Sequence, residues 1–308
     1  MNVLFISSGN SKNGISPIVK NQGESLKKEN INIDYFTIKG KGAKGYLKSI
    51  FRLRAYLKSK KRYDVVHVHY WLSAIVASLA GAKPLVVSLM GDDVKAKVWF
   101  KWIIYAFNFV SWSTIIVKSK DMYNSLGLKR VNIIPNGIDM NRFRPIEREI
   151  AIKELGWDSR KRHILFTSDP KRFEKNFQLL EKALEIINNK NLELHSLKDI
   201  PNERIFYYYN ASDVVVLTSL WEGSPNAIKE SMACNRPIVA TDVGDVKEVI
   251  SNTEGCYLCS FEPKDVALKI EKALEHKGAT TGREDIQHLK SELIAKKIID
   301  IYNDVKGK

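Results

Sequence analysis

The segment Leu217-Thr-Ser-Leu-Trp-Glu-Gly-Ser-Pro-Asn-Ala-Ile-Lys-Glu230 contains the pattern on which the fold prediction depends. An apolar run ends at Thr218, a turn rich in Gly, Ser and Pro follows, and good helix formers fill Asn226–Cys234. This order predicts a strand, a tight turn and a helix. Ser224 suits the N-cap of that helix and Pro225 its first position, because an oxygen there caps free amides and a proline there loses no hydrogen bond.

The same strand–helix pattern recurs along the whole chain. Short runs rich in Val, Ile and Leu indicate strands buried on both faces of a parallel sheet. The predicted strands of the first half are Val3–Ser7, Ile33–Thr37, Val65–Val68, Leu85–Leu89, Thr114–Val117 and Val131–Ile134. Those of the second half are His163–Thr167, Leu192–Ser196, Val214–Thr218, Ile238–Thr241 and Gly255–Cys259. The helices expected between them are Ile18–Glu29, Tyr46–Lys60, Leu72–Ala80, Val98–Phe109, Lys120–Ser125, Lys175–Asn188, Ile205–Asn210, Asn226–Cys234, Val246–Ile250 and Pro263–Glu275. The alternation predicts an α/β protein with two Rossmann-like, doubly wound domains.

The break between the two domains is predicted at Pro135-Asn-Gly-Ile-Asp139, where turn residues follow the sixth strand. We expect domains at residues 1–145 and 146–284 and a closing helix at 285–308 that crosses back to the first domain. Ligands of doubly wound sheets bind at the carboxyl ends of the strands. Two such edges predict a site in a cleft between the domains.

The net charge of +14 favours anionic partners without choosing among them. Ten Lys and Arg residues and no acid occur from Lys39 to Arg62, a run that includes the predicted amphipathic helix Tyr46–Lys60, and aromatic residues follow Val98. Docking on an anionic membrane surface and an ordinary core stripe with a solvated charged face both fit this pattern.

Other segments bear on the location of the protein. The N-terminus lacks the pattern of a signal peptide. The stretch Val98–Val117 carries polar residues and ends as a strand, so it is a poor membrane span. Cys256 and Cys259 fall in a predicted strand, which argues against a metal or redox pair. A cytoplasmic location is expected, with peripheral attachment to the inner face of the membrane if the basic helix docks.

Two carboxylates, Glu222 and Glu230, flank the turn of the opening segment. The amides of the helix start provide a site for an anion or a hydroxyl. On the turn, Glu222 can accept hydrogen bonds from sugar hydroxyls, and Glu230 can hold vicinal hydroxyls such as those of a ribose. A capped helix with two solvated acids is the alternative.

The resemblance of these residues to a known family favours a ligand site over a capped helix with two solvated acids. The spacing of Glu222 and Glu230 resembles the E-x7-E signature of the retaining family 4 glycosyltransferases (glycosyl transferases group 1), which have the GT-B fold. The stretches Ser231–Asp245 and Ile134–Asp139, with Phe143 and Pro145, resemble the downstream and linker patterns of that family.

The resemblance implies a donor site in the second domain. Glu222 and the backbone of the turn (Gly223, Ser224, Pro225 and Asn226) would hold the donor sugar and its phosphates, and Glu230 the donor ribose. Lys175 and Arg172, or Lys171 in place of Arg172, would neutralise the diphosphate, because fixed cations stabilise developing negative charge. No cofactor and no metal are expected.

The first domain would hold the acceptor side. The resemblance places Gly14 near the donor phosphates. It places Asp93 near the acceptor. His69 lies near the carboxyl edge of its predicted strand and could contact the acceptor, although a packed or capping role fits it equally well. Ser119 is either an acceptor contact or an N-cap. Met90 stands where the family often has a histidine.

The predicted function is therefore that of a retaining hexosyltransferase. It would move a sugar from a nucleotide-sugar donor to a saccharide or lipid-linked acceptor. The alternatives are a nucleotide-sugar epimerase or phosphorylase on the same fold, and a nucleic-acid- or anion-binding protein. The chain lacks a recognisable nucleic-acid module, so no nucleic-acid partner is expected. Base recognition is expected at Leu197, Lys198 and Asp199.

Overall fold

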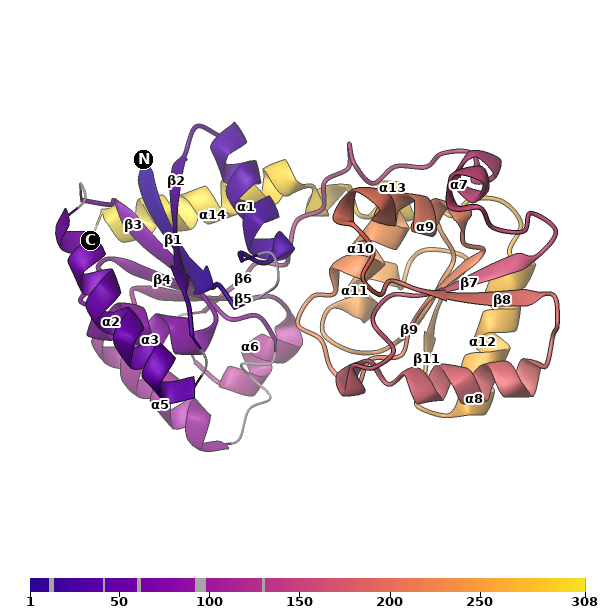
Figure 1. Ribbon diagram of the computed structural model, residues 1–308, viewed down its shortest axis with the longest axis horizontal. Helices are drawn as coiled ribbons and strands as arrows, with labels where there is room; N and C mark the ends of the chain where they lie inside the picture. The colour runs from indigo at the N-terminus through magenta and orange to yellow at the C-terminus, as the bar shows by residue number, and fades with distance from the viewer. Residues whose placement is uncertain (11–13, 41, 60–61, 92–97, 129–130, 308) are drawn as a thin grey trace. The chain divides into compact units, whose positions relative to one another are not determined.

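The computed structural model describes residues 1–10, 14–40, 42–59, 62–91, 98–128 and 131–307 (Figure 1). The chain forms two compact units. Unit 1 comprises Met1–Gly137 and Ser291–Lys308, and unit 2 comprises Ile138–Lys290. The sequence predicts these boundaries after residues 145 and 284.

Unit 1 contains a six-stranded parallel sheet with the strand order β2-β1-β3-β4-β5-β6. Its strands are β1 (Asn2–Ser8), β2 (Asn32–Ile38), β3 (Val65–His69), β4 (Leu85–Ser88), β5 (Thr114–Val117) and β6 (Val131–Ile133). Every residue of β3 and β4 is buried. This burial is what their Val-rich composition predicts for strands covered on both faces.

The helices of unit 1 cover this sheet. They are α1 (Pro17–Lys28), α2 (Gly42–Ser59), α3 (Trp71–Leu79), α5 (Val98–Val110), α6 (Lys120–Leu126) and α14 (Ser291–Lys306). Helix α3 contacts both α2 and α5, and the three lie side by side in Figure 1. Their inner faces bury the main core of the unit, which includes Leu53, Ala74 and Ile104.

Unit 2 contains a five-stranded sheet with the order β11-β10-β9-β7-β8, and its described strand pairs are parallel. Its strands are β7 (Arg162–Phe166), β8 (Leu192–Ser196), β9 (Val214–Leu217), β10 (Ile238–Thr241) and β11 (Cys256–Cys259). Its helices are α7 (Arg148–Leu155), η1 (Phe173–Lys175), α8 (Phe177–Ile187), η2 (Asn202–Arg204), α9 (Ile205–Ala211), α10 (Asn226–Ala233), α11 (Val246–Ile250), α12 (Pro263–Glu275), α13 (Gly282–Asp285) and η3 (Gln287–Leu289). The two parallel sheets confirm the predicted fold class.

The C-terminal helix α14 belongs to unit 1, as predicted. It packs against α1 and β3 (Figure 1). The Tyr302 hydroxyl lies 2.5 Å from Nδ1 of His67, and Lys306 pairs with Asp64 at 2.8 Å. Because both Tyr302 and His67 are fully buried, this bond satisfies two polar groups that would otherwise be costly to bury.

Two local predictions are corrected by the structure, and a further helix of unit 2 was not predicted. The single closing helix expected at 285–308 is divided, with α13 and η3 preceding α14. The helix expected over Lys175–Asn188 is interrupted at Asn176, which has a left-handed backbone with φ of 50° and separates η1 from α8. Helix α7 was not predicted, and its polar composition gives a weak apolar stripe.

The stretch Val98–Val117 forms two elements rather than one. Helix α5 ends at Val110, and β5 begins at Thr114. Within the part of the chain that the structure describes, no helix has both the length and the apolar character needed to cross a membrane.

Candidate functional site

The turn between β9 and α10 is anchored to the segment that precedes α8. The Thr218 hydroxyl lies 3.0 Å from the carbonyl oxygens of Lys175 and Asn176. The Leu220 amide donates to the Glu174 carbonyl over 2.9 Å. These bonds bring together the carboxyl edges of β7 and β9, which are neighbours in the sheet.

Lys175 and Glu222, two predicted catalytic residues, form an ion pair at this edge. The Lys175 Nζ donates to Glu222 Oε1, and both side chains are 14% exposed. The Ser219 hydroxyl donates to the same carboxylate oxygen over 2.7 Å. Charge-assisted bonds in a partly desolvated place are stronger than neutral ones. The pair therefore holds a cation and an anion in fixed positions beside the turn.

Arg172 is placed differently from Lys175. Its Nε donates to Glu174 Oε1 over 2.7 Å, and its side chain is 54% exposed. Lys171, the alternative cation, is also exposed. An exposed ion pair of this kind is worth at most about 1 kcal/mol, so little holds Arg172 to Glu174. Its assignment to the diphosphate remains a prediction.

The structure corrects the predicted capping of α10. Pro225 occupies the N-cap, without a side-chain capping bond, and Ser224 lies one residue before it. The buried Ser224 hydroxyl instead donates to Asp245 Oδ2 over 2.7 Å and accepts from Lys229 Nζ. Lys229 is 1% exposed and pairs with Asp245 at 2.9 Å. A buried ion pair therefore replaces the expected cap, and Lys229 and Asp245 were not predicted as site residues.

The backbone of Gly223 is supported from the following strand–helix connection. Gly244 has φ of +63°, and a Cβ at this position would lie 2.7 Å from the Gly223 carbonyl oxygen. Only glycine combines this conformation with such a close approach. At the first residue of α10, Asn226 Oδ1 is buried without a hydrogen-bond partner within the described structure. A buried orphan acceptor is uncommon and suits a site that receives a ligand hydroxyl.

Glu230 lies deeper in unit 2, next to a buried tyrosine. The Tyr209 hydroxyl donates to Glu230 Oε2 over 2.7 Å, and Tyr209 is fully buried. Burial raises the pKa of Glu230, while the bond from Tyr209 and the charge of Arg142 act in the opposite direction. Sequence reasoning missed both Tyr209 and Arg142, because each comes from a distant segment.

Two of the predicted residues of unit 1, His69 and Ser119, have packing and capping contacts. His69 is 2% exposed, and its Nε2 lies 2.6 Å from Gln22 Oε1. Ser119 is buried and caps α6, accepting from the Met122 amide over 3.3 Å. These contacts match the packed or capping role considered for His69 and the N-cap role considered for Ser119 in the sequence. Gly14 has φ of +75°. Asp93 lies outside the described residues.

Among the described residues, three potential metal ligands lie close together at one place. His163, Glu193 and His195 each offer a ligand atom within 4.8 Å of the others, and none of them belongs to the site around Glu222. Burial raises the pKa of the thiols of Cys256 and Cys259 to about 12, so neither is a ready thiolate ligand. The prediction that the donor site works without metal is untested.

Comparison with known families agrees with the resemblance seen in the sequence. A model described as "Glycosyltransferase Family 4" matches residues 18–142, and one described as "Glycosyl transferases group 1" matches residues 174–276. Together they match most of the chain, and the second includes Lys175, Glu222 and Glu230.

Several curated proteins are similar in sequence. The UDP-Gal:alpha-D-GlcNAc-diphosphoundecaprenol alpha-1,3-galactosyltransferase of Escherichia coli is 25% identical, over 71% of this chain and 68% of that protein. A putative teichuronic acid biosynthesis glycosyltransferase of Bacillus subtilis is 26% identical, over 63% and 57%. The N,N'-diacetylbacillosaminyl-diphospho-undecaprenol alpha-1,3-N-acetylgalactosaminyltransferase of Campylobacter jejuni is 27% identical, over 68% and 62%. The chain thus spans 57% to 68% of the length of these relatives.

Solved structures share the fold over the full chain. A sucrose-phosphate synthase from Thermosynechococcus elongatus matches with a TM-score of 0.78 at 18% identity and covers 99% of both chains. The Anabaena protein HepE in complex with UDP and glucose matches with a TM-score of 0.76 at 17% identity, over 99% of this chain and 100% of that one. At these identities the match shows the fold, which is that of GT-B enzymes.

Proposed function

Because the chain belongs to the family 4 glycosyltransferases of group 1, we propose that unit 2 binds a nucleotide-sugar donor and that the protein transfers the sugar with retention of its anomeric configuration. The observation that supports this most directly is the Lys175–Glu222 ion pair beside the turn at Gly223, with Glu230 one helix turn further on. The site combines a cation, two carboxylates and free amides at a helix start, which is what a sugar diphosphate needs.

Lys175 stabilises the departing nucleoside diphosphate in this proposal. Breaking the bond between sugar and diphosphate leaves negative charge on the phosphate oxygens. A cation already fixed nearby lowers the barrier without having to reorganise. Arg172 adds a second positive charge by leaving Glu174, at small cost because that pair is exposed.

Glu222 and Glu230 hold hydroxyl groups of the donor. Glu222 accepts from the sugar when Lys175 turns to the diphosphate, and Ser219 keeps its carboxylate in place. Tyr209 occupies one oxygen of Glu230. The other carboxylate oxygen accepts from the ribose of the nucleotide. Asn226 Oδ1, an acceptor without a described partner, is suited to a further donor hydroxyl.

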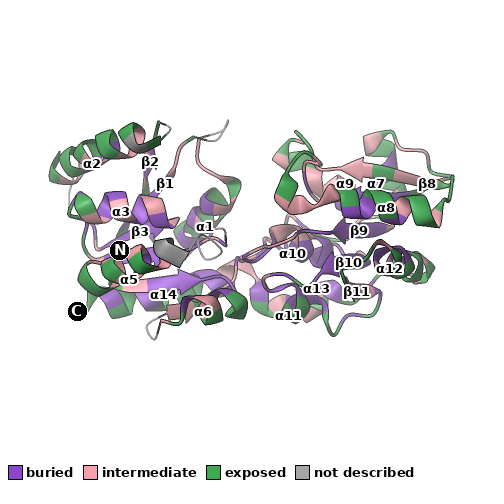
Figure 2. Cartoon of the chain, turned by 90° about the horizontal axis from the view of Figure 1, so that it is seen from below, coloured by how far each residue is buried: buried purple, intermediate pink, exposed green. Residues whose placement is uncertain are grey.

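The acceptor in this proposal is a lipid-linked saccharide at an anionic membrane, and the transferred sugar is a hexose. The names of the E. coli and C. jejuni relatives include diphosphoundecaprenol-linked acceptors. Helix α2 is largely exposed in Figure 2. Its apolar side chains Leu47 and Phe51 are 58% and 64% exposed, and they stand next to Lys48 and Arg52 in the sequence. On α5 Trp102 and Phe109 are exposed as well. Exposed apolar groups between cations match an anionic lipid surface.

The test is a transfer assay preceded by a donor screen. Nucleotide sugars that bind should raise the melting temperature, and NMR of the fresh product should show the anomeric configuration of the donor. An inverted product would overturn the proposed reaction.

Two substitutions test the site itself. Glu230→Ala should weaken donor binding, since it removes the ribose acceptor. Glu222→Gln should mainly lower turnover. Glu248→Ala, an exposed acid on α11, is the control and should change neither. If donor affinity and rate stay at wild-type values in both site variants, the residue assignment is wrong.

A further inference from the structure

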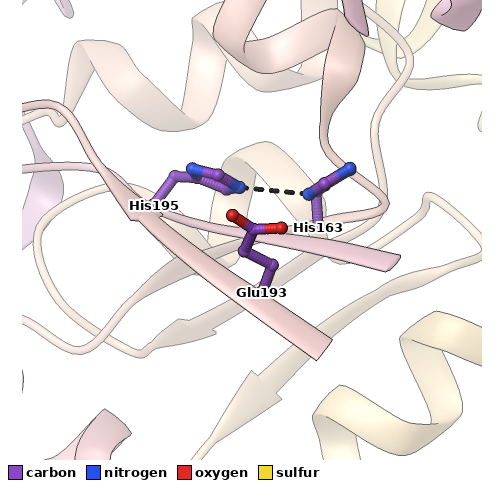
Figure 3. A group of neighbouring side chains, drawn as sticks. All are labelled: His163, Glu193 and His195. Atoms are coloured by element: carbon purple, nitrogen blue, oxygen red, sulfur yellow. Dashed lines mark hydrogen bonds between the residues drawn. The ribbon is translucent and has the colours of Figure 1, made fainter. Parts of the chain in front are cut away.

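Two histidines and a glutamate meet on one face of strands β7 and β8 in unit 2. His163 lies opposite Glu193 in the register of the two parallel strands, and His195 follows two residues later on β8. Residues two apart on a strand point to the same face. Figure 3 shows the Glu193 carboxylate beneath the line that joins the two imidazole rings.

The ring nitrogens already lie close to the spacing of two metal ligands. Nδ1 of His163 is 3.0 Å from Nε2 of His195, and one ligand atom from each of the three residues lies within 4.8 Å of the others. Two nitrogens on a tetrahedral zinc ion, each at about 2.0–2.1 Å, are about 3.3 Å apart. The two nitrogens would have to separate by only a few tenths of an ångström, with the shared proton moved to Nδ1 of His195, and the Glu193 oxygen would have to move closer to them.

Groups outside the cluster orient both rings. Nε2 of His163 lies 3.0 Å from the Asp158 carbonyl oxygen, so this nitrogen carries the proton and the Nδ1 lone pair faces the cluster. Metal-binding histidines characteristically donate their second ring N–H in this way. The Trp157 ring stacks on His195 with centroids 3.5 Å apart and planes 8° from parallel. Both orienting residues come from the connection between α7 and β7.

The burial of the cluster suits neutral ligands. His163 is fully buried, and His195 and Glu193 are half-buried. Desolvation is the largest cause that lowers the pKa of His195 to about 4 and also lowers that of His163. Neutral imidazoles bind metal without first losing a proton. Glu193 is otherwise held by Lys161 over 3.7 Å, in a pair whose side chains are 40% and 37% exposed, and such pairs are weak.

We propose that His163, His195 and Glu193 bind one divalent transition-metal ion of the zinc class, which joins the edge strand β8 to β7. Imidazole nitrogens and a carboxylate are ligands that zinc accepts, and three protein ligands leave a position for water. The site is separate from the donor residues, because His163 is near the amino end of β7 whereas Lys175 follows its carboxyl end. The ion would stabilise unit 2 rather than take part in transfer.

The experiment uses the full chain, stripped of metal with a chelator and exchanged into chelator-free buffer. Titration with Zn²⁺ should raise the melting temperature. Titration with Co²⁺ should give visible absorption that saturates at one equivalent. His195→Gln and Glu193→Gln should each lower the affinity by about tenfold or more, since even orienting groups contribute 10- to 100-fold.

His288→Gln removes an exposed histidine elsewhere in unit 2 and should bind as the wild type does. Glu193 is on the open side of the cluster, so Glu193→Gln keeps the test valid if His195→Gln fails to fold. The proposal is overturned if the wild type shows neither the thermal shift nor the absorption, or if either ligand variant keeps wild-type affinity. None of these measurements depends on transferase activity.

Discussion

The candidate residues of the two units differ in charge and in the kind of contact they make. In unit 2 the charged side chains near the turn are paired within the protein, Lys175 with Glu222 and Lys229 with Asp245. In unit 1 the candidate polar residues His69 and Ser119 are neutral partners in packing and capping. The cations of α2 (Lys44, Lys48, Arg52, Arg54 and Lys58) are exposed, whereas Lys118 of the same unit is buried. Under the proposed function, unit 2 holds its charges in place for the donor, and the exposed cations of α2 are the surface that meets the membrane.

The largest effect should come from breaking the charge arrangement of unit 2. Lys175→Ala should lower turnover by about 10²- to 10³-fold, the loss typical of removing one preorganised electrostatic group. Steady-state kinetics with a saturating donor would measure it. Lys182→Ala removes an exposed cation of α8 that has no proposed contact with the donor, and it should have little effect. Equal losses in the two variants would mean that overall charge, not placement, matters.

The surface of unit 1 is tested by charge reversal on α2. Replacing Lys48, Arg52 and Lys58 by Glu should reduce binding to anionic vesicles by roughly 100-fold or more, because each cation near such a surface contributes about 1 kcal/mol. Co-sedimentation with and without anionic lipid measures the partitioning, which should also weaken with salt.

The matched control reverses three cations of unit 2, Lys182 on α8 and Lys264 and Lys272 on α12. These residues are exposed and change the net charge by the same amount. Vesicle binding should fall much less in this control. Wild-type protein that stays in the supernatant at physiological salt would exclude membrane docking and favour a soluble acceptor.

A smaller effect should follow from removing the hydrogen bond that Tyr209 donates to Glu230. Glu230 must be ionised to accept ribose hydroxyls, and burial holds its pKa above the ordinary value. Donor affinity should therefore fall as pH decreases through that raised pKa. Tyr209→Phe removes a bond that favours the charged form, so the fall should begin at higher pH, with about tenfold weaker binding at neutral pH.

Calorimetric titration of the donor across pH separates this effect from general damage. Tyr207→Phe, on the same helix, should leave the pH profile unchanged. A Tyr209→Phe profile that is weaker at every pH but not displaced would assign Tyr209 a purely structural role.

The fold could be predicted closely from the sequence because its strands are apolar runs. The predicted strands at Thr114–Val117, Leu192–Ser196 and Ile238–Thr241 match β5, β8 and β10 residue for residue. Errors occurred where tertiary contacts override local pattern. At Asn176 the chain leaves the helical conformation as Thr218 binds the Lys175 and Asn176 carbonyls. That contact joins residues more than 40 positions apart and has no local signal.

The site could be predicted only for residues within the turn motif. Glu222 and Glu230 are recognisable by their spacing. Lys229, by contrast, is a lysine in a helix, which suggests a solvated side chain. Its burial depends on Asp245, which follows the next strand, and so the pairing cannot be inferred from either segment alone. The contact of Tyr209 with Glu230 cannot be inferred from the sequence either, because nothing local distinguishes Tyr209 from its neighbours Tyr207 and Tyr208.

The smallest effect is expected from chelation, which should leave the transfer rate unchanged. This result would distinguish the donor site of unit 2 most clearly from the cluster of His163, Glu193 and His195. Transfer should persist in EDTA, because Lys175, Arg172 and the amides at the start of α10 supply the positive charge that a metal would otherwise bring. Within the described residues, metal-ligand spacing occurs only at His163, Glu193 and His195. Chelation of zinc-loaded protein should therefore lower the melting temperature while the rate at 25 °C stays unchanged. Transfer that is lost in EDTA and restored by Mg²⁺ would show that the donor diphosphate needs a metal, and the role given to Lys175 would have to be shared with it.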